Sequence, residues 1–314
     1  MNRCYWKWRA TKSKGLQIVF RAERAVTLRL QVEELQHEHN GVVFPVEGID
    51  LFQVGYVVTQ KPVEYPVDYV GWWPDPLLPR AELKLRPDEN QVAWLSVRTG
   101  KQASPGIYRG QVGIWADGQR MGAIPLQLRV YQVTLPDSST IQTAFSLYDN
   151  MFDQVYGRER ASELRSRYVD FIADHRINLD HLYRRQVPDL EELAVLAHRG
   201  RLNAFNLLYL DAKAPYDRKA LAKLAARLDP VVAQLHEFGL IGKAYIYGFD
   251  EVEVGDFAIM EKVFAFIKDR YPQLRTATTA RDPGLGLDRR LGELVDIWVP
   301  LSAAYEADTA ARAR

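Results

Sequence analysis

The sequence predicts a β-sandwich followed by an α/β domain. Apolar residues alternate with polar ones over the first 138 residues, the period changes after Leu135, and beyond it short apolar runs alternate with helix-length amphipathic segments. Alternation of period two is typical of half-buried strands, whereas strand–helix repetition is typical of parallel sheets with crossover helices. The predicted domains are therefore a β-sandwich over residues 1–138 and an α/β domain over residues 139–314.

The first domain is assigned from short strands with turn residues between them. An Asp117-Gly118 pair between two alternating runs is a strong hairpin signal. Many short strands with proline and glycine between them are typical of a sandwich. The alternating runs cover residues 16–20, 26–32, 93–97, 112–114 and 124–130.

The second domain is assigned from six apolar runs with amphipathic segments between them. A helix before the second run is predicted to bury Ala161, Leu164, Tyr168, Phe171, Ile172 and His175, and a later one Phe257, Met260, Val263, Phe264 and Ile267. Pro230 is expected to kink or divide the helix over 221–238. Six units are fewer than the eight of a (β/α)₈ barrel, so the pattern fits either an open sheet or an incomplete barrel. The runs cover residues 141–148, 177–183, 203–210, 243–249, 274–279 and 295–301.

Composition excludes several classes of protein. The 314 residues carry 41 Lys and Arg against 40 Asp and Glu, so charge gives no basis for a nucleic-acid or anionic-membrane partner. No apolar run approaches the roughly 18 residues of a membrane helix, and the first apolar stretch is too short for a signal peptide. The single cysteine, Cys4, excludes an intrachain disulfide and a cysteine-based zinc site. The compartment and the oligomeric state stay open.

Asp250 and Glu251 end the fourth apolar run of the second half. In barrel enzymes the active site lies at the carboxyl ends of the strands, so these acids are candidates for catalysis. Adjacent residues of an extended strand point to opposite faces, so the two acids share a pocket only if the backbone leaves strand geometry near 249–251. The alternative is a solvated acidic loop, because Glu253 and Asp256 follow closely.

Four stretches together resemble glycoside hydrolase family 123, the β-N-acetylgalactosaminidase-like group. The resemblance covers roughly residues 50 to 314 and implies a β-sandwich ahead of a (β/α)₈ barrel, of which about six β/α units are present. It implies a chain truncated at its C-terminus, and the N-terminus too enters the sandwich without a lead-in. Val252 also stands where many relatives have proline. The stretches are GWWPDPLLP (71–79), ASPGIYRGQVGIWADG (103–118), IPLQLRVYQVTLPDSSTIQTAFSLY (124–148) and YIYGFDEVEV (245–254).

The resemblance also implies an activity and the roles of the two acids. It implies removal of a terminal β-linked N-acetylhexosamine, above all N-acetylgalactosamine, with retention and by attack of the substrate's own 2-acetamido oxygen. Glu251 is then the general acid/base, and Asp250 orients the acetamido N–H. Adjacent acids fit this substrate-assisted route better than the usual pair of carboxylates on opposite sides of the bond. The implied partner is a glycan or glycoconjugate.

Aromatic residues at strand ends are candidates for substrate binding, because their faces pack against the C–H face of a sugar. Tyr247 and Trp298 are the strongest candidates, and packing within the fold is the competing interpretation. No metal site is expected, and no nucleotide cofactor, because the sequence has no G-x-G-x-x-G or Walker loop. The full set of binding candidates is Tyr148, His181, Tyr183, Tyr209, Tyr247 and Trp298.

Two other functions remain open at this point. A non-catalytic carbohydrate-binding protein on the same scaffold would bind amino sugars without turnover. An inactive fragment would expose apolar strand edges and aggregate.

Overall fold

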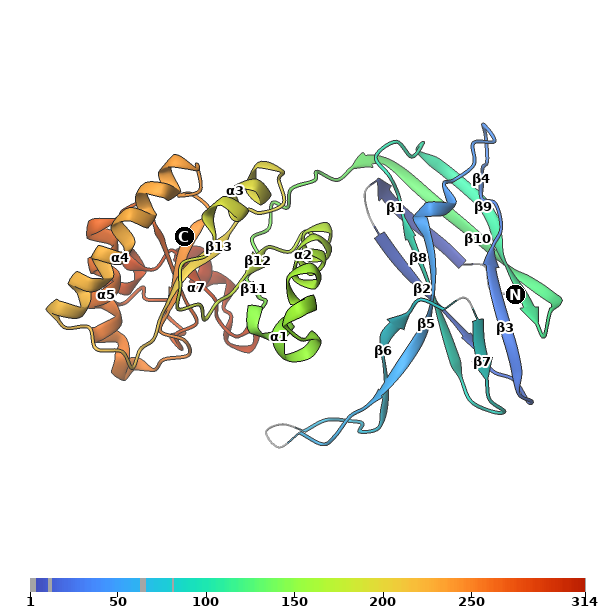
Figure 1. Ribbon diagram of the computed structural model, residues 1–314, viewed down its shortest axis with the longest axis horizontal. Helices are drawn as coiled ribbons and strands as arrows, with labels where there is room; N and C mark the ends of the chain where they lie inside the picture. Colours follow the sequence, from blue (N-terminus) through green and yellow to red (C-terminus); the bar gives the residue numbers. More distant parts are fainter. Residues whose placement is uncertain (1–3, 11–12, 63–65, 81, 314) are drawn as a thin grey trace. The chain divides into compact units, whose positions relative to one another are not determined.

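The computed structural model describes residues 4–10, 13–62, 66–80 and 82–313. By their contacts these divide into two compact units, Met1–Pro136 and Asp137–Arg314 (Figure 1). Each unit is described by itself.

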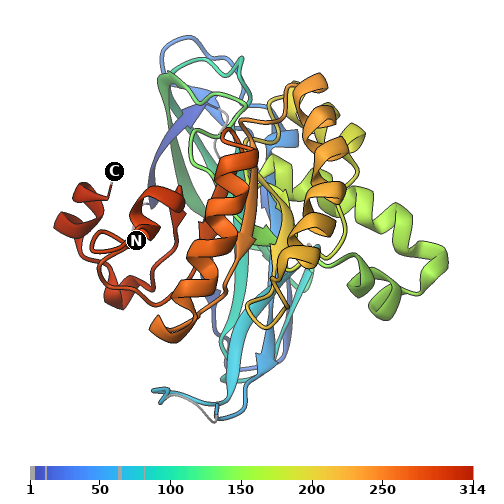
Figure 2. The same ribbon diagram turned by 90° about the vertical axis from the view of Figure 1, so that its left-hand side faces the viewer.

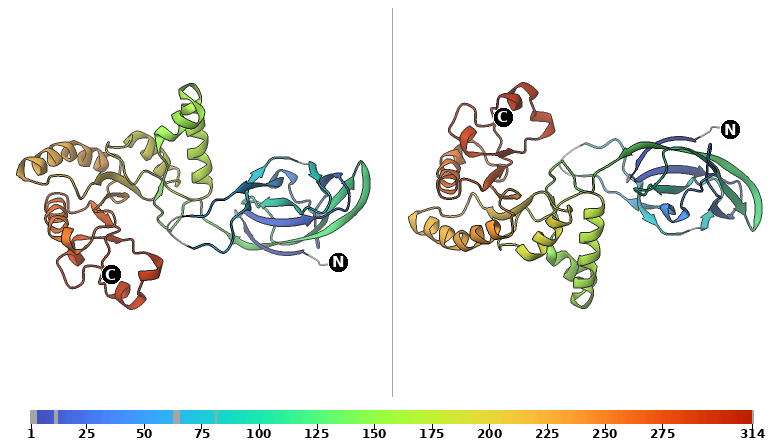
Figure 3. Two further views of the ribbon diagram at one scale, coloured as in Figure 1. Left: turned by 90° about the horizontal axis from the view of Figure 1, so that it is seen from below. Right: turned by 90° about the horizontal axis from the view of Figure 1, so that it is seen from above.

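The first unit is a sandwich of two sheets (Figure 3). One sheet has the strand order β1-β10-β9-β3-β7, with β4 paired to β9, and the other has the order β2-β8-β5-β6. Neighbouring strands are antiparallel except β1 and β10, which are parallel. The strands are β1 (Cys4–Ala10), β2 (Ser13–Phe20), β3 (Val26–Val32), β4 (Gln36–His37), β5 (Ile49–Val58), β6 (Trp72–Leu78), β7 (Glu82–Leu85), β8 (Gln91–Arg98), β9 (Gly106–Ala116) and β10 (Gln119–Thr134), with a 3₁₀ turn at Val46–Gly48.

The predicted hairpin is confirmed as β9 and β10. Ala116 pairs with Gln119, so Asp117 and Gly118 form a two-residue turn. Their φ values are 49° and 84°, as a type I′ turn requires. The predicted alternation is confirmed too, because Leu28 and Leu30 of one sheet and Leu95 and Val97 of the other are buried in a common core.

The second unit alternates strands with helices, and its paired strands are all parallel. Each of the six predicted apolar runs contains one strand. The elements are β11 (Phe145–Ser146), α1 (Asp149–Tyr156), α2 (Arg158–Asp174), β12 (Leu179–Asp180), α3 (Leu190–His198), β13 (Phe205–Leu210), α4 (Arg218–Glu237), β14 (Ala244–Gly248), α5 (Phe257–Arg270), β15 (Arg275–Thr278), α6 (Leu291–Leu294), β16 (Ile297–Trp298) and α7 (Ala307–Arg312), with 3₁₀ turns at Val254–Asp256 and Ser302–Ala304.

These strands do not close a barrel over the described residues. They form a two-stranded sheet, β11-β12, and a four-stranded sheet, β13-β14-β15-β16. Side chains bridge the sheets: Asp180 Oδ1 accepts from the Asn206 N–H at 2.9 Å, and the Asn206 side-chain amide donates to the carbonyls of His181 at 3.2 Å and Leu182 at 2.6 Å. The expected barrel is thus replaced by an open arrangement in which a carboxylate and an amide take the place of ladder bonds.

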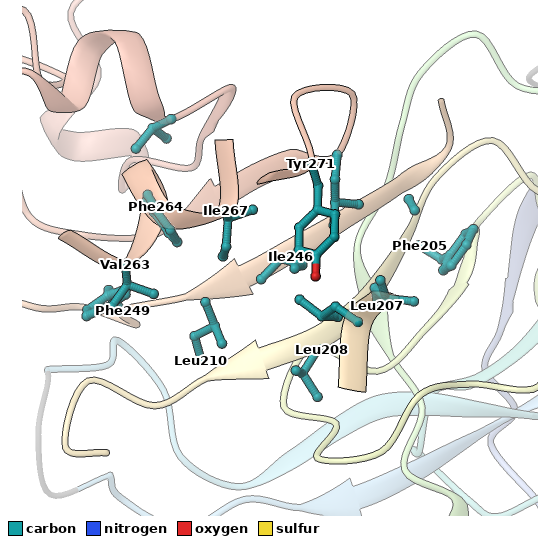
Figure 4. Close-up of a cluster of buried hydrophobic side chains, with 14 of the residues drawn as sticks. Phe205, Leu207, Leu208, Leu210, Ile246, Phe249, Val263, Phe264, Ile267 and Tyr271 are labelled. Carbon is teal, nitrogen blue, oxygen red and sulfur yellow. The ribbon is translucent and has the colours of Figure 1, made fainter. Parts of the chain in front are cut away.

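The buried face predicted from the sequence is found in α5 but only in part in α2. In α5 the five predicted core residues are all buried, and Figure 4 labels three of them, Val263, Phe264 and Ile267. In α2 the predicted face is confirmed at Ala161, which is buried, and wrong at Phe171, which is 62% exposed. The other buried residues are Val169 and Ala173. Helix α1 accounts for part of this difference, because Tyr168 packs against its Phe152 with ring centroids 5.1 Å apart.

Helix α4 runs unbroken through Pro230, so the expected division does not occur. Figure 2 shows α4 and α5 side by side against the strands. Arg270 of α5 binds Asp229 of α4 through two nitrogens, at 2.9 and 2.6 Å. Within the described ranges, the helices lack the length and apolarity that a membrane span requires.

Candidate active site

The chain turns sharply after β14. Phe249 and Glu251 have φ values of 54° and 50°, in the left-handed region that bulky side chains rarely adopt. A Cβ atom on Gly248 would lie 2.6 Å from the Leu210 Cβ, so the turn begins where only glycine fits. The backbone therefore leaves strand geometry at the position that sequence reasoning required for Asp250 and Glu251 to share a pocket.

Phe249 anchors this turn in the core. Its ring is fully buried and lies 5.4 Å from Phe264 and 5.9 Å from Tyr216, measured between centroids (Figure 4). Its N–H donates to the Leu210 carbonyl at 3.0 Å, and its carbonyl accepts from the Thr278 hydroxyl at 3.0 Å. Burial and two hydrogen bonds offset the cost of the left-handed backbone, which is of order 1–3 kcal/mol for such a residue.

Three hydroxyls converge on the Asp250 carboxylate. Tyr183 donates to Oδ2 at 3.0 Å, Thr279 donates to Oδ1 at 2.7 Å, and Tyr247 also donates to Oδ1. A carboxylate oxygen accepts about two hydrogen bonds, so Oδ1 is saturated. Among the described residues, Oδ2 accepts only from Tyr183. The carboxylate is thus fixed in orientation and keeps one acceptor position for a donor from outside.

Tyrosines from three strand ends form one cluster beside Asp250. The ring of Tyr209 lies 5.1 Å from that of Tyr183 and 5.7 Å from that of Tyr247. Burial, followed by the hydrogen bonds to Asp250, raises the pKa of Tyr183 and of Tyr247. Burial, followed by the charge of Asp250, raises the pKa of Tyr209 to about 12. The hydroxyls of Tyr183 and Tyr247 therefore stay protonated at neutral pH and act as donors.

Glu251 is exposed and lies within a small charge cluster. Its Oε2 accepts from Arg281 Nη2 at 2.9 Å, and the other Arg281 nitrogen, Nη1, binds Glu253 Oε1 at 3.2 Å. These carboxylates raise the pKa of Arg281, and the hydrogen bond that Arg281 donates to Glu251 is the largest cause. The Glu251 N–H donates to the Thr279 hydroxyl at 3.0 Å. Thr279 therefore contacts both adjacent acids.

Asp180 fixes the end of β12, from which Tyr183 reaches Asp250. It is 1% exposed, accepts from the His181 N–H at 2.7 Å and from the Tyr245 hydroxyl, and lies 3.6 Å from Arg184 Nη2. Burial raises the pKa of Asp180, while its hydrogen bonds and Arg184 act in the opposite direction. With Asn206, this carboxylate sets the position of the Tyr183 segment relative to β13 and β14.

The remaining binding candidates lie in two other places. His181 and Tyr148 contact each other, with ring centroids 4.5 Å apart. His181 also lines a groove of about 600 Å³ together with Arg165, Arg184, Asp189 and Glu192 among others, and neither Asp250 nor Glu251 belongs to its lining.

Trp298 is partly buried and packs against the core between the four-stranded sheet and its helices. Tyr247 and Tyr209 belong to a separate cluster with Tyr245, Ala277 and Ile297. The structure therefore brings Tyr183, Tyr209 and Tyr247 together with Asp250, and it separates Trp298 from them.

Sequence reasoning missed Thr279 and the bridging role of Asn206. Thr279 follows β15, the strand next to β14, so its position past a neighbouring strand end was the available signal. Arg281, two residues later, forms an ion pair with Glu251 at 2.9 Å.

The chain matches no protein-family model and no curated protein. Among solved structures it is similar to a family 123 glycoside hydrolase from Clostridium perfringens, described for glycolipid glycan hydrolysis, with a TM-score of 0.74 and 12% sequence identity. The similarity covers 98% of this chain and 64% of that one. The chain thus shares the fold of a family 123 glycoside hydrolase over about two thirds of that protein's length.

Two further solved structures overlap more weakly. A β-glucuronidase 2 variant from Bacteroides uniformis has a TM-score of 0.35 at 10% identity, over 93% of this chain and 35% of that one. A family 5 xyloglucanase from Bacteroides ovatus has a TM-score of 0.22 at 9% identity, over 95% of this chain and 67% of that one. These scores are too low to support an argument.

Proposed function

We propose that the chain is a glycoside hydrolase that removes a terminal β-linked N-acetylhexosamine, above all N-acetylgalactosamine, by substrate-assisted catalysis with retention. The observation that carries the proposal is the hydrogen-bond pattern of Asp250. Its Oδ1 accepts from two hydroxyls and its Oδ2, among the residues that the structure describes, from one, so Oδ2 keeps an acceptor position that a ligand can use. An amide N–H, such as that of a 2-acetamido group, is the donor that fits it.

Asp250 then orients the acetamido group for attack. With its N–H held by Oδ2, the acetamido oxygen forms a bond to the anomeric carbon while the bond to the leaving oxygen breaks. The resulting oxazolinium ion carries a positive charge that the neighbouring carboxylate stabilises. Thr279 and the tyrosines Tyr183 and Tyr247 keep the carboxylate from rotating, so little reorganisation accompanies the reaction.

Glu251 transfers the protons. It donates one to the leaving oxygen, and then takes one from the water that attacks the anomeric carbon and reopens the ring. Two displacements at one carbon leave the β-configuration unchanged. The ion pair with Arg281 must first open, and this costs little, since both side chains are more than half exposed and solvent weakens such pairs.

One observation favours a second candidate function, a carbohydrate-binding protein without turnover. The Arg281 guanidinium binds Glu251 and Glu253 at once, so the carboxylate of the proposed acid is engaged in an ion pair. If Arg281 stays bound to Glu251 and Glu253 while a ligand is present, the protein would recognise an amino sugar through Asp250 and leave the glycosidic bond intact.

Hydrolysis of 4-nitrophenyl N-acetyl-β-galactosaminide by the wild type, Asp250→Asn and Glu251→Gln tests the proposal. We expect turnover by the wild type and a loss of at least about 100-fold in kcat for Asp250→Asn, which removes the charge that stabilises the oxazolinium ion. The loss for Glu251→Gln should be smaller with this substrate, because nitrophenolate departs without a proton. Equal rates in the three proteins would exclude the assigned roles. Calorimetric binding of N-acetylgalactosamine without turnover would instead support the binding protein.

A further inference from the structure

We propose that Thr279 is a positioning residue that couples Asp250 to Glu251, an inference that rests on the function proposed above and extends it to a residue outside the acidic pair. Its single hydroxyl donates to Asp250 Oδ1 at 2.7 Å and accepts from the Glu251 N–H at 3.0 Å. It therefore holds the side chain of one acid and the backbone of the next.

A count of protons supports this assignment. The Tyr247 and Thr279 hydroxyls lie 2.9 Å apart, and each also contacts Asp250 Oδ1. Each hydroxyl has one proton, and the carboxylate can only accept. When both donate to Oδ1, no proton lies between them, and the lone pairs of Thr279 are left for the Glu251 N–H. This is the one arrangement that provides Oδ1 with two donors and the N–H with an acceptor.

The Thr279 hydroxyl matters because the backbone of Glu251 has an unusual conformation. Glu251 has a φ of 50°, which is uncommon for a side chain of this kind and persists where neighbouring groups hold it. Thr279 supplies that hold from a different segment, past the end of β15. The side-chain direction of Glu251, and with it the line along which a proton reaches the leaving oxygen, depends on this hydrogen bond.

Removal of the hydroxyl should impair the chemical step rather than binding. In Thr279→Val, Asp250 Oδ1 loses one donor and the Glu251 N–H loses its acceptor, at nearly unchanged side-chain volume. With an alkyl β-N-acetylgalactosaminide, whose leaving oxygen needs a proton, we expect kcat to fall about 10- to 100-fold, with KM changed less than about threefold. Thr279→Ser keeps the hydroxyl and should stay within about threefold of the wild type.

Thr276→Val is the matched control. Thr276 lies at the other end of β15, and its buried hydroxyl donates to the Leu294 carbonyl and contacts Asp296. The same substitution there should lower the melting temperature and leave kcat unchanged. If Thr279→Val does not fold, Thr279→Ala carries the same expectation.

Amide hydrogen exchange of Glu251 tests the coupling without substrate. We expect exchange at least about tenfold faster in Thr279→Val than in the wild type, and little change in Thr279→Ser. Unchanged exchange in the valine variant, or a loss of kcat that serine does not restore, would overturn the proposal. A wild type without hydrolysis would defeat the proposed function, and the exchange result would still decide whether Thr279 holds Glu251.

Discussion

The Tyr183 hydroxyl donates to Asp250 Oδ2 at 3.0 Å, and the two residues follow strands of different sheets, β12 and β14. A hydrogen bond to an ionised group contributes about 1.5–3 kcal/mol, and less where it is exposed, as Tyr183 is at 38%. This contact therefore both orients the carboxylate and joins the two sheets at the candidate site.

Tyr183→Phe should reduce kcat/KM for the aryl glycoside about 5- to 20-fold, because Oδ2 loses its fixed partner and the carboxylate can turn. Steady-state kinetics measures the change. Tyr156→Phe is a suitable control, since it removes a tyrosine–tyrosine hydrogen bond of 2.8 Å from the helical layer, and it should keep kcat/KM within twofold. An equal loss in both variants would assign the effect to stability.

Glu251→Gln should show a dependence on the leaving group. Nitrophenolate departs without a proton, whereas an alkoxide does not, so the loss in kcat should be larger for an alkyl than for a nitrophenyl β-N-acetylgalactosaminide. The ratio of the two losses, from matched assays, should be at least about tenfold. A ratio near one would show that Glu251 does not protonate the leaving oxygen.

Asp229 should make stability depend on pH. Hydrogen bonds from Arg270, and then from Tyr271, lower its pKa to about 2. A carboxyl with a depressed pKa stabilises the fold above its unfolded value, near 3.9, and loses this contribution as pH falls toward 2. Asp229→Asn should melt below the wild type at pH 6 and approach it at pH 2.5. Calorimetry at both values measures the difference, and a constant gap would contradict the ion-pair origin.

Gly248→Ala should destabilise the second unit. The new Cβ would meet the Leu210 Cβ at 2.6 Å and its carbonyl at 2.9 Å, and such overpacking costs about 1–3 kcal/mol. Gly255→Ala is the control, because no heavy atom lies within 4 Å of the Cβ it would add. Urea denaturation compares the two, and we expect a clear loss of unfolding free energy only for the first. If Gly248→Ala were as stable as Gly255→Ala, the backbone near residue 248 must shift to make room for the new Cβ.

The sequence predicted where the strands lie along the chain, but not whether neighbouring strands pair into one closed sheet. Period-two alternation identified β3 and β8, and the Asp117-Gly118 pair identified the β9–β10 turn, because local geometry decides both. Whether β12 pairs with β13 depends on Asp180 and Asn206, which are 26 residues apart and meet only after folding. No local pattern carries that information.

The candidate site divides in the same way. The location of Asp250 and Glu251 past a strand end was predictable, since a parallel sheet brings carboxyl ends to one edge. Thr279 reaches Asp250 from 29 residues away, and Arg281 reaches Glu251 from 30. From the sequence alone, a threonine whose hydroxyl bonds inside the core cannot be told from one whose hydroxyl bonds to a site residue at the edge of the sheet.

In a continuous sheet the spacing of neighbouring strands is distributed over many backbone bonds, and no single substitution changes it. Between β12 and β13 the spacing depends on a few contacts. They are the carboxylate of Asp180, a backbone hydrogen bond from the Tyr209 N–H to the Arg184 carbonyl at 2.9 Å, and the side chain of Asn206, which also accepts from the Tyr247 N–H at 3.0 Å. A substitution at Asn206 therefore acts on the spacing of Tyr183 and Tyr247 without changing either acid.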